Sequence, residues 1–128
     1  MRQLAFILLL PSFIFSCTPT TKEIQLLKTS NEFQKESDKF ISIGMPIQKA
    51  RQIVESNKFE CTDHKNDIFA AEKRDANGQL ISDRSVQGDF LWCSIESSFM
   101  ATTRWNIFIL YKKSRVTMIH AVIHHQNF

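Results

Sequence analysis

The sequence lacks several patterns on which enzymes and cofactor-binding proteins depend. It contains only three glycines, Gly44, Gly78 and Gly88, which are too few and too scattered to build a phosphate-binding loop. No serine lies in a G-x-S-x-G elbow. The acidic residues have no spacing that would force two of them into one cleft. These absences predict a protein that is not an enzyme and that carries no cofactor.

A strong charge of one sign is also absent. Sixteen Lys and Arg residues face thirteen Asp and Glu residues, which gives a net charge of +3. The basic residues are scattered, and their densest group, Lys112, Lys113 and Arg115, is explained by the tip of a hairpin. A nucleic-acid partner needs a basic patch or stripe, so we expect no nucleic-acid binding.

Metal-binding spacing is missing as well. There is no C-x-x-C pair, and the four histidines are His64, His120, His124 and His125. On a strand, His124 and His125 point to opposite faces, and His120 and His124 are about 13 Å apart at roughly 3.3 Å per residue. A designed zinc site would need further ligands. We therefore expect no functional metal, although adventitious binding near the C-terminus is possible.

The one long apolar run is at the start of the chain. Residues 4–15 are apolar except for Pro11 and Ser12, and they follow a short positive head that contains Arg2. A membrane-spanning helix needs roughly 20 apolar residues. The pattern therefore predicts a removable signal peptide over residues 1–16.

The end of this segment, Ile14-Phe15-Ser16-Cys17, resembles the bacterial lipobox, although a smaller residue than Phe15 is usual there. The resemblance implies that Cys17 is acylated and becomes the mature N-terminus, with the lipid bilayer as its partner. Two or more acyl chains anchor a protein stably. Thr18, rather than aspartate, follows the cysteine, which by the same resemblance favours the outer membrane, facing the periplasm. The alternatives are a secretory signal without lipid and, less favoured, a buried cytosolic cysteine.

The remaining residues, 17–128, have the length of one domain. Two cysteines are left, Cys61 and Cys93. In an oxidising compartment such a pair indicates a disulfide more readily than a metal site. The closed loop would contribute about 3–4 kcal/mol on the chain-entropy model.

We expect residues 17–39 to form a tether and residues 40–128 to form the folded domain. Within 23–39, Leu26, Phe33 and Phe40 recur every seven residues and predict a weak amphipathic helix. The alternative is a partly disordered extension of the tether.

The main helix is predicted over 46–56. Pro46 suits its first turn, and a buried stripe follows at Ile47, Ala50, Ile53 and Val54. Asn57 can adopt the left-handed conformation that ends a helix.

The rest of the domain is predicted to be mainly β-structure. Strands are expected at Phe59 and the residues that follow, and over 90–95, 105–111 and 116–123, with a hairpin turn at 112–114. Residues 66–88 form a long excursion: 70–74 favour helix, whereas Asn77-Gly78 is a strong hairpin signal if strands flank it. The fold class is therefore α+β, with one main helix packed on an antiparallel sheet of about four strands.

Two exposed sites are candidates for contact with a partner. The first is the tip around Asn77 and Gly78. The second is Phe99-Met100, in the expected turn S-S-F-M-A-T-T, where apolar residues either fold back onto the core or bind another protein. The other aromatic residues, Trp92 and Trp105 among them, are expected to fill the core.

The order of these parts resembles small bacterial lipoproteins of the SmpA/OmlA type, which share a helix-then-strands fold with β-lactamase-inhibitor proteins. The resemblance lies in I-G-M-P, A-R-Q-I-V, F-E-C, W-N-I-F-I-L-Y and R-V-T-M-I-H-A-V, over residues 43–123. Pro46 stands where a serine or threonine cap is usual, and the insert 66–88 and the cysteine pair are departures. The sequence matches no partner-contact motif of the family.

The function that these observations favour is that of a lipid-anchored periplasmic protein that acts as a structural or protein-interaction module of the cell envelope. The alternative is an inhibitor or immunity lipoprotein that blocks a periplasmic enzyme or toxin. Such a protein would present a rigid loop, for which the excursion around Asn77-Gly78 is the candidate.

Overall fold

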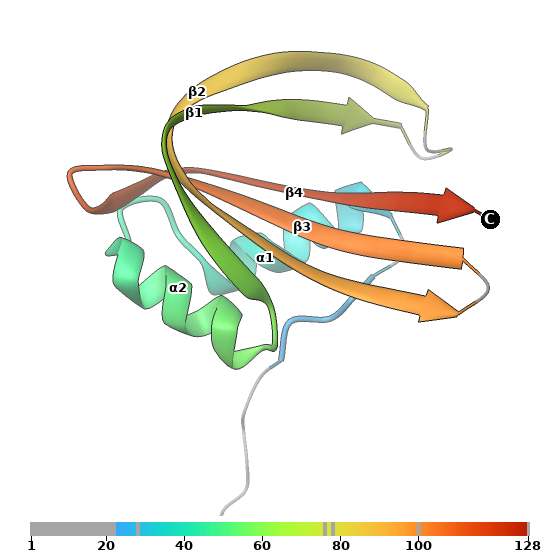
Figure 1. Ribbon diagram of the computed structural model, residues 1–128, viewed down its shortest axis with the longest axis horizontal. Coiled ribbons are helices and arrows are strands. Elements are labelled where there is room, and N and C mark those ends of the chain that lie inside the picture. The colour runs from blue at the N-terminus through green and yellow to red at the C-terminus, as the bar shows by residue number, and fades with distance from the viewer. Residues whose placement is uncertain (1–22, 28, 76, 78, 100, 128) are drawn as a thin grey trace, which may run out of the picture.

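The computed structural model describes residues 23–27, 29–75, 77, 79–99 and 101–127. Within these residues, two helices precede four strands (Figure 1). The elements are α1 Ser30–Phe40, α2 Ile47–Ser56, β1 Glu60–Arg74, β2 Leu80–Phe99, β3 Ala101–Lys112 and β4 Arg115–Asn127. Cys17 and the segments predicted to be signal peptide and polar tether lie outside the described residues, apart from the last part of 17–39.

The four strands form one antiparallel sheet in the order β1-β2-β3-β4. Each strand pairs with its neighbour in sequence, so hairpins alone connect the sheet. At the β3–β4 turn, Lys113 and Ser114 both have positive φ, 53° and 65°. Positive φ at both central residues is the mark of a type I′ turn, whose twist matches that of the flanking strands. The predicted α+β class, the four strands and the hairpin at 112–114 are confirmed.

The prediction of one main helix is incomplete, because two helices cover the same face of the sheet (Figure 1). α1 begins at Ser30 because the Thr29 hydroxyl accepts a hydrogen bond from the Glu32 N–H. Leu26 lies before the helix and is 41% exposed, whereas Phe33 is fully buried. The seven-residue spacing of Leu26 and Phe33 therefore does not mark one helix face.

The packed structure also begins earlier than residue 40. Ile24 is buried in the core, and its N–H donates to Asn57 Oδ1 at 2.9 Å. The Trp105 indole N–H donates to the carbonyl oxygen of Leu27. The described residues before α1 therefore pack against the sheet as a strap.

α2 follows the prediction closely, with Pro46 as its N-cap and Ile47, Ala50 and Val54 buried. Its end differs from the prediction. Asn57 has φ of −97°, and Lys58 is the residue with positive φ, 74°. The Asn57 side chain instead donates to the Ile53 carbonyl and accepts from Ile24, so it joins α2 to the strap.

The excursion 66–88 is a long hairpin formed by β1 and β2, and the helical alternative for 70–74 is wrong. Phe69, Ala71 and Val86 pack together under this hairpin, and such burial overrides a local helical preference. The pairing shifts register between His64 and Asp67. There the hairpin bends over the face of the sheet away from the helices (Figure 1). Gly88 lies at this bend with φ of 157°, and a Cβ there would lie 2.9 Å from Leu110 Cδ1, so a side chain at this position would require Leu110 to move.

The sheet therefore separates two cores. The core under the helices contains Ile24, Phe33, Ile41, Ile47, Ala50, Val54, Phe59, Leu91, Cys93, Ile107, Ile109, Val116, Ala121 and Ile123. The smaller core under the hairpin contains Phe69, Ala71, Val86 and Phe90, with Trp92, Phe108, Leu110 and Met118 packed against it.

Cys61 of β1 and Cys93 of β2 stand directly opposite each other and are joined by a disulfide. The bond lies on the helix side, where Cys93 is fully buried. It closes the base of the β1–β2 hairpin. No helix within the described part of the chain is long and apolar enough to cross a membrane.

Candidate functional site

The two predicted interaction sites lie at one end of the molecule, where the β1–β2 turn and the end of β2 are found (Figure 1). Asn77 is exposed, and its N–H donates to Asp75 Oδ1. Gly78 and Met100 lie outside the described residues. Phe99 is the last residue of β2 and pairs with Ala101.

The expected turn S-S-F-M-A-T-T is shorter than predicted. Ser97 pairs with Thr103 and Ser98 pairs with Thr102, so the ladder between β2 and β3 continues almost to the end of the hairpin. The branched Cβ of Thr102 and Thr103 favours the extended conformation of a strand.

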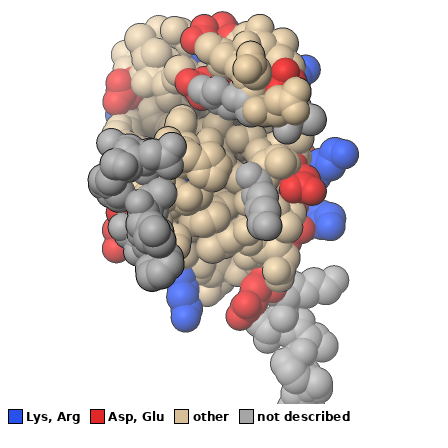
Figure 2. Space-filling model, turned by 90° about the vertical axis from the view of Figure 1, so that its right-hand side faces the viewer, with Lys and Arg blue, Asp and Glu red and all other residues tan. Residues whose placement is uncertain are grey.

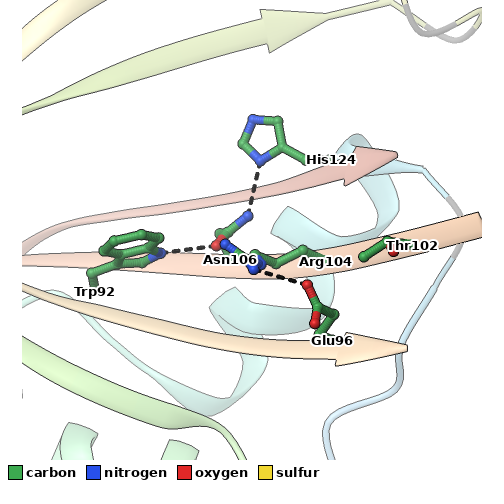
Figure 3. Close-up of a pocket in the computed structure, with 6 residues that line it drawn as sticks. All are labelled: Trp92, Glu96, Thr102, Arg104, Asn106 and His124. Carbon is green, nitrogen blue, oxygen red and sulfur yellow. Dashed lines mark hydrogen bonds and ion pairs between the residues drawn. The ribbon is translucent and has the colours of Figure 1, made fainter. Parts of the chain in front are cut away.

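A pocket of about 200 Å³ opens on the sheet face away from the helices (Figure 3). We call it the Asn106 pocket. Side chains from β2, β3 and β4 surround it: Trp92, Glu96, Thr102, Arg104, Asn106 and His124. Period 2 places Arg104 and Asn106 of β3 on this face, while Trp105 between them points to the helix side and bonds to Leu27.

Asn106 organises the pocket. Its side chain accepts a 2.8 Å hydrogen bond from the Trp92 indole N–H at Oδ1. An indole nitrogen can only donate, so the amide orientation is fixed and Nδ2 faces His124 Nδ1 at 2.9 Å. His124 Nδ1 must then accept, and the neutral ring carries its proton on Nε2. Asn106 is only 2% exposed, and its hydrogen bonds to Trp92 and His124 satisfy the buried polar atoms of its side chain.

The series of interacting side chains extends from His124 into the β1–β2 hairpin above the pocket. His124 Nε2 lies 3.5 Å from Glu72 Oε1 of β1. Strands at the two edges of the sheet, β1 and β4, are therefore linked across the curved hairpin. Figure 3 shows His124 above Asn106 and Trp92 to the left of Asn106.

The rim of the pocket carries an ion pair that is open to solvent. Arg104 Nη2 donates to Glu96 Oε2 at 2.8 Å, and both side chains are about half exposed, at 45% and 46%. Exposed pairs contribute only about 0–1 kcal/mol to stability. Their charges remain accessible to a partner.

His120 lies beside this site and next to the rings of Phe69 and Phe108, which stack on each other. Its Nε2 is buried and has no hydrogen-bond partner among the described residues. Burial lowers the pKa of His120, Glu72 raises it, and His124 and Arg84 lower it. The ring therefore favours its neutral form. It lines a second, larger cavity of about 550 Å³ between α1, β4 and the hairpin.

The four histidines do not converge on one point. His64 bonds to Thr62 and Asp67, and His125 contacts Thr103. No group of three or more His, Cys, Asp or Glu residues in the described ranges could hold a metal ion.

Sequence reasoning missed the Asn106 pocket. It assigned Trp92 to the core, and Trp92 does pack against the smaller core, while its indole N–H bonds to Asn106. One signal was present: Asn106 is a polar residue inside the apolar strand W-N-I-F-I-L-Y. A buried polar side chain in such a strand needs partners. These partners come from β2 and β4, and one sequence does not reveal which residues they are.

Comparison with models of protein families, with curated proteins and with solved structures gave no match in any of the three. The resemblance to lipoproteins of the SmpA/OmlA type stays a prediction.

Proposed function

We propose that the protein is a lipid-anchored envelope protein, without enzymatic activity, that faces the periplasm and binds another protein through the Asn106 pocket. The observation that carries the proposal is the pocket itself. It combines an aromatic ring, an accessible Arg–Glu pair and a buried amide held in one orientation. Trp and Arg are enriched among the residues that dominate protein–protein binding energy.

The arrangement suits recognition better than chemistry. Asn106 and His124 bond to each other, and Trp92 bonds to Asn106, so these polar groups hold a fixed surface. Thr102 contributes a hydroxyl group to the pocket lining. Among the described residues, no hydrogen bond joins this hydroxyl to His124, so His124 is not placed to act as its base. An activated nucleophile needs a base within hydrogen-bond reach.

The charge distribution at one end of the molecule also suits protein binding. Figure 2 views the end where β2 and β4 finish, and uncharged side chains occupy much of its middle. Most of the Lys, Arg, Asp and Glu side chains visible there lie towards the outline. Protein interfaces have a core depleted of charge and a polar rim.

Acylation at Cys17 would hold the domain near the membrane. Five residues, 18–22, lie between Cys17 and Glu23, the first described residue, so six residue steps join the two. A chain of that length spans at most about 21 Å. The partner would therefore be a membrane protein or a protein close to the membrane surface.

The test is a pulldown of the full chain from crosslinked envelopes, read by mass spectrometry, with wild type, Cys17→Ser and Arg104→Glu compared. We expect recovery of an envelope protein to fall at least about tenfold in Arg104→Glu. Lys49→Glu, an equal charge change on an exposed α2 residue, is the matched control. Equal recovery with Arg104→Glu and Lys49→Glu would contradict a role for the pocket. If Cys17→Ser fractionates with membranes as wild type does, the anchor proposal fails.

A second candidate is the inhibitor or immunity role, which the β1–β2 hairpin favours. Near its tip, Leu80 and Ile81 are 50% and 58% exposed, and Asn77 is exposed in the turn. The disulfide closes the base of the hairpin. A single hydrolase or toxin recovered in near-stoichiometric yield, and lost with Leu80→Asp rather than with Arg104→Glu, would favour this role.

A further inference from the structure

The two edges of the sheet differ in charge. β1, one edge strand, has the sequence E-C-T-D-H-K-N-D-I-F-A-A-E-K-R, with charged residues along its length and a register shift after His64. Charges and bulges are means by which edge strands avoid pairing with other chains. β4, the other edge, reads R-V-T-M-I-H-A-V-I-H-H-Q-N and contains no acid and only one Lys or Arg, Arg115. A long uncharged edge strand rich in β-branched residues is prone to pair with another strand.

The chain itself covers the β4 edge, and it does so in two stretches. In the first stretch, main chain pairs with main chain. Val116 donates its N–H to the Met45 carbonyl and accepts from the Gly44 N–H, at 2.9 and 2.7 Å. Pro46 forms an isolated bridge with Arg115.

In the second stretch, α1 side chains take the place of a strand. The Gln34 amide donates to the Ile119 carbonyl at 3.1 Å and accepts from the Ala121 N–H at 2.7 Å. The Ser30 hydroxyl accepts from the Ile123 N–H at 3.0 Å. Residues 119, 121 and 123 alternate along the strand, as the outward-facing backbone groups of an edge strand do. The Gln34 side chain thus offers one donor and one acceptor, as the peptide group of a neighbouring strand would.

We infer that α1 covers the β4 edge and prevents it from pairing with another strand. When α1 leaves this edge, β4 pairs with the β4 of a second copy of this chain. The uncharged sequence of β4 suits such self-pairing. An antiparallel pair centred on Ala121 would place Ile119 of one copy opposite Ile123 of the other. No like charges would then face each other between these positions. The inference stands apart from the proposed partner site.

Self-pairing requires α1 to leave the edge in both copies. The apparent dimerisation constant then varies with the square of the equilibrium constant for undocking of α1. Removing the bonds of Gln34 and Ser30 should raise undocking about tenfold. The apparent dimerisation constant should therefore rise roughly a hundredfold.

The experiment compares the full chain with its Ser30→Ala, Gln34→Ala double variant, both carrying Cys17→Ser so that acyl chains cannot drive association. Light scattering across a concentration series gives the dimerisation constant. Hydrogen exchange reports the amides of Ala121 and Ile123. We expect a dimer in which both amides stay protected. The matched control is Asn31→Ala with Lys35→Ala, two exposed α1 residues, which should behave as the parent does.

A double variant that keeps its fold, exchanges the Ala121 and Ile123 amides faster and shows no rise in dimerisation would overturn the inference. The Trp92 indole N–H, which bonds to Asn106 on the sheet face away from α1, reports whether the fold is kept. If the double variant unfolds, the dimerisation constant of the single variant Ser30→Ala tests the inference instead, because this change removes only the contact with Ile123. We then expect a smaller rise, roughly threefold or more, and no rise would overturn the inference.

Discussion

The sheet face under the helices is packed mainly with aliphatic side chains, whereas the opposite face, under the β1–β2 hairpin, is packed with aromatic rings and polar groups. Among the described residues, the core under the helices contains fourteen buried residues and the core under the hairpin contains four. The hairpin side also holds buried Asn106 and His120, whose Nε2 has no hydrogen-bond partner in the part of the chain that the structure describes. Regions with fewer buried apolar contacts open at lower free energy, and binding sites are drawn from them. The helix side should therefore set the stability and the hairpin side should set recognition.

The largest effect is expected on the helix side. Phe33→Ala removes a fully buried ring that stacks with Phe59, and we expect a loss of about 3–5 kcal/mol in the free energy of unfolding. Urea denaturation measures this loss. Leu26→Ala, at a half-exposed position before α1, should cost far less and serves as the control. A loss under about 1 kcal/mol for Phe33→Ala would mean that α1 contributes little to the core.

The disulfide is expected to give the next effect. Replacing both Cys61 and Cys93 by alanine opens the base of the hairpin and frees the unfolded chain, at a cost of about 3–4 kcal/mol on the chain-entropy model. Calorimetry with and without reductant checks the loss. Wild type under reducing conditions should match the double variant, and wild type that keeps its full stability when reduced would count against this account.

A smaller effect is expected for Asn106→Ala on the hairpin side. The change leaves the Trp92 N–H without its acceptor and His124 without its donor. Leaving such groups unpaired costs about 1–3 kcal/mol. In NMR spectra the Trp92 indole N–H signal should shift, while that of Trp105, which bonds to Leu27 on the other face, should stay. Equal shifts of both signals would show a global change instead.

The smallest effect concerns pH. Burial holds the pKa of His120 below its ordinary value of about 6.5. The unfolded chain therefore binds a proton that the folded chain resists, and stability falls as the pH drops from about 6.5 towards the lowered value. His120→Phe should reduce this dependence in urea titrations at pH 7.5 and 5.5. His125→Gln, an exposed position on the same strand, should keep it, and identical profiles for all three proteins would rule out His120.

Particular residues show how far pattern reasoning reached. The helix that starts after Pro46 and the strand around Cys61 follow from period 3.6 and period 2, because each pattern reflects one buried face. The start of α1 was missed, although Thr29 and Glu32 have the spacing of a capping box. The apolar stripe of α1 is weak, so hydrophobic periodicity did not show where the helix begins. Much of the contact between α1 and the sheet is made by the polar side chains of Gln34 and Ser30, which bond to the backbone of β4.

The sequence by itself determined the α+β class, a sheet of about four antiparallel strands, the hairpin at 112–114, helix α2 and the pairing of Cys61 with Cys93, because these depend on local periodicity and on the number of cysteines. The tertiary structure alone decided that β1 and β2 bend over the free face, that Asn106 joins Trp92 to His124, and that Gln34 covers the edge of β4. Each of these contacts joins residues from different elements. Their alignment depends on the twist and register of the whole sheet, which no local pattern encodes.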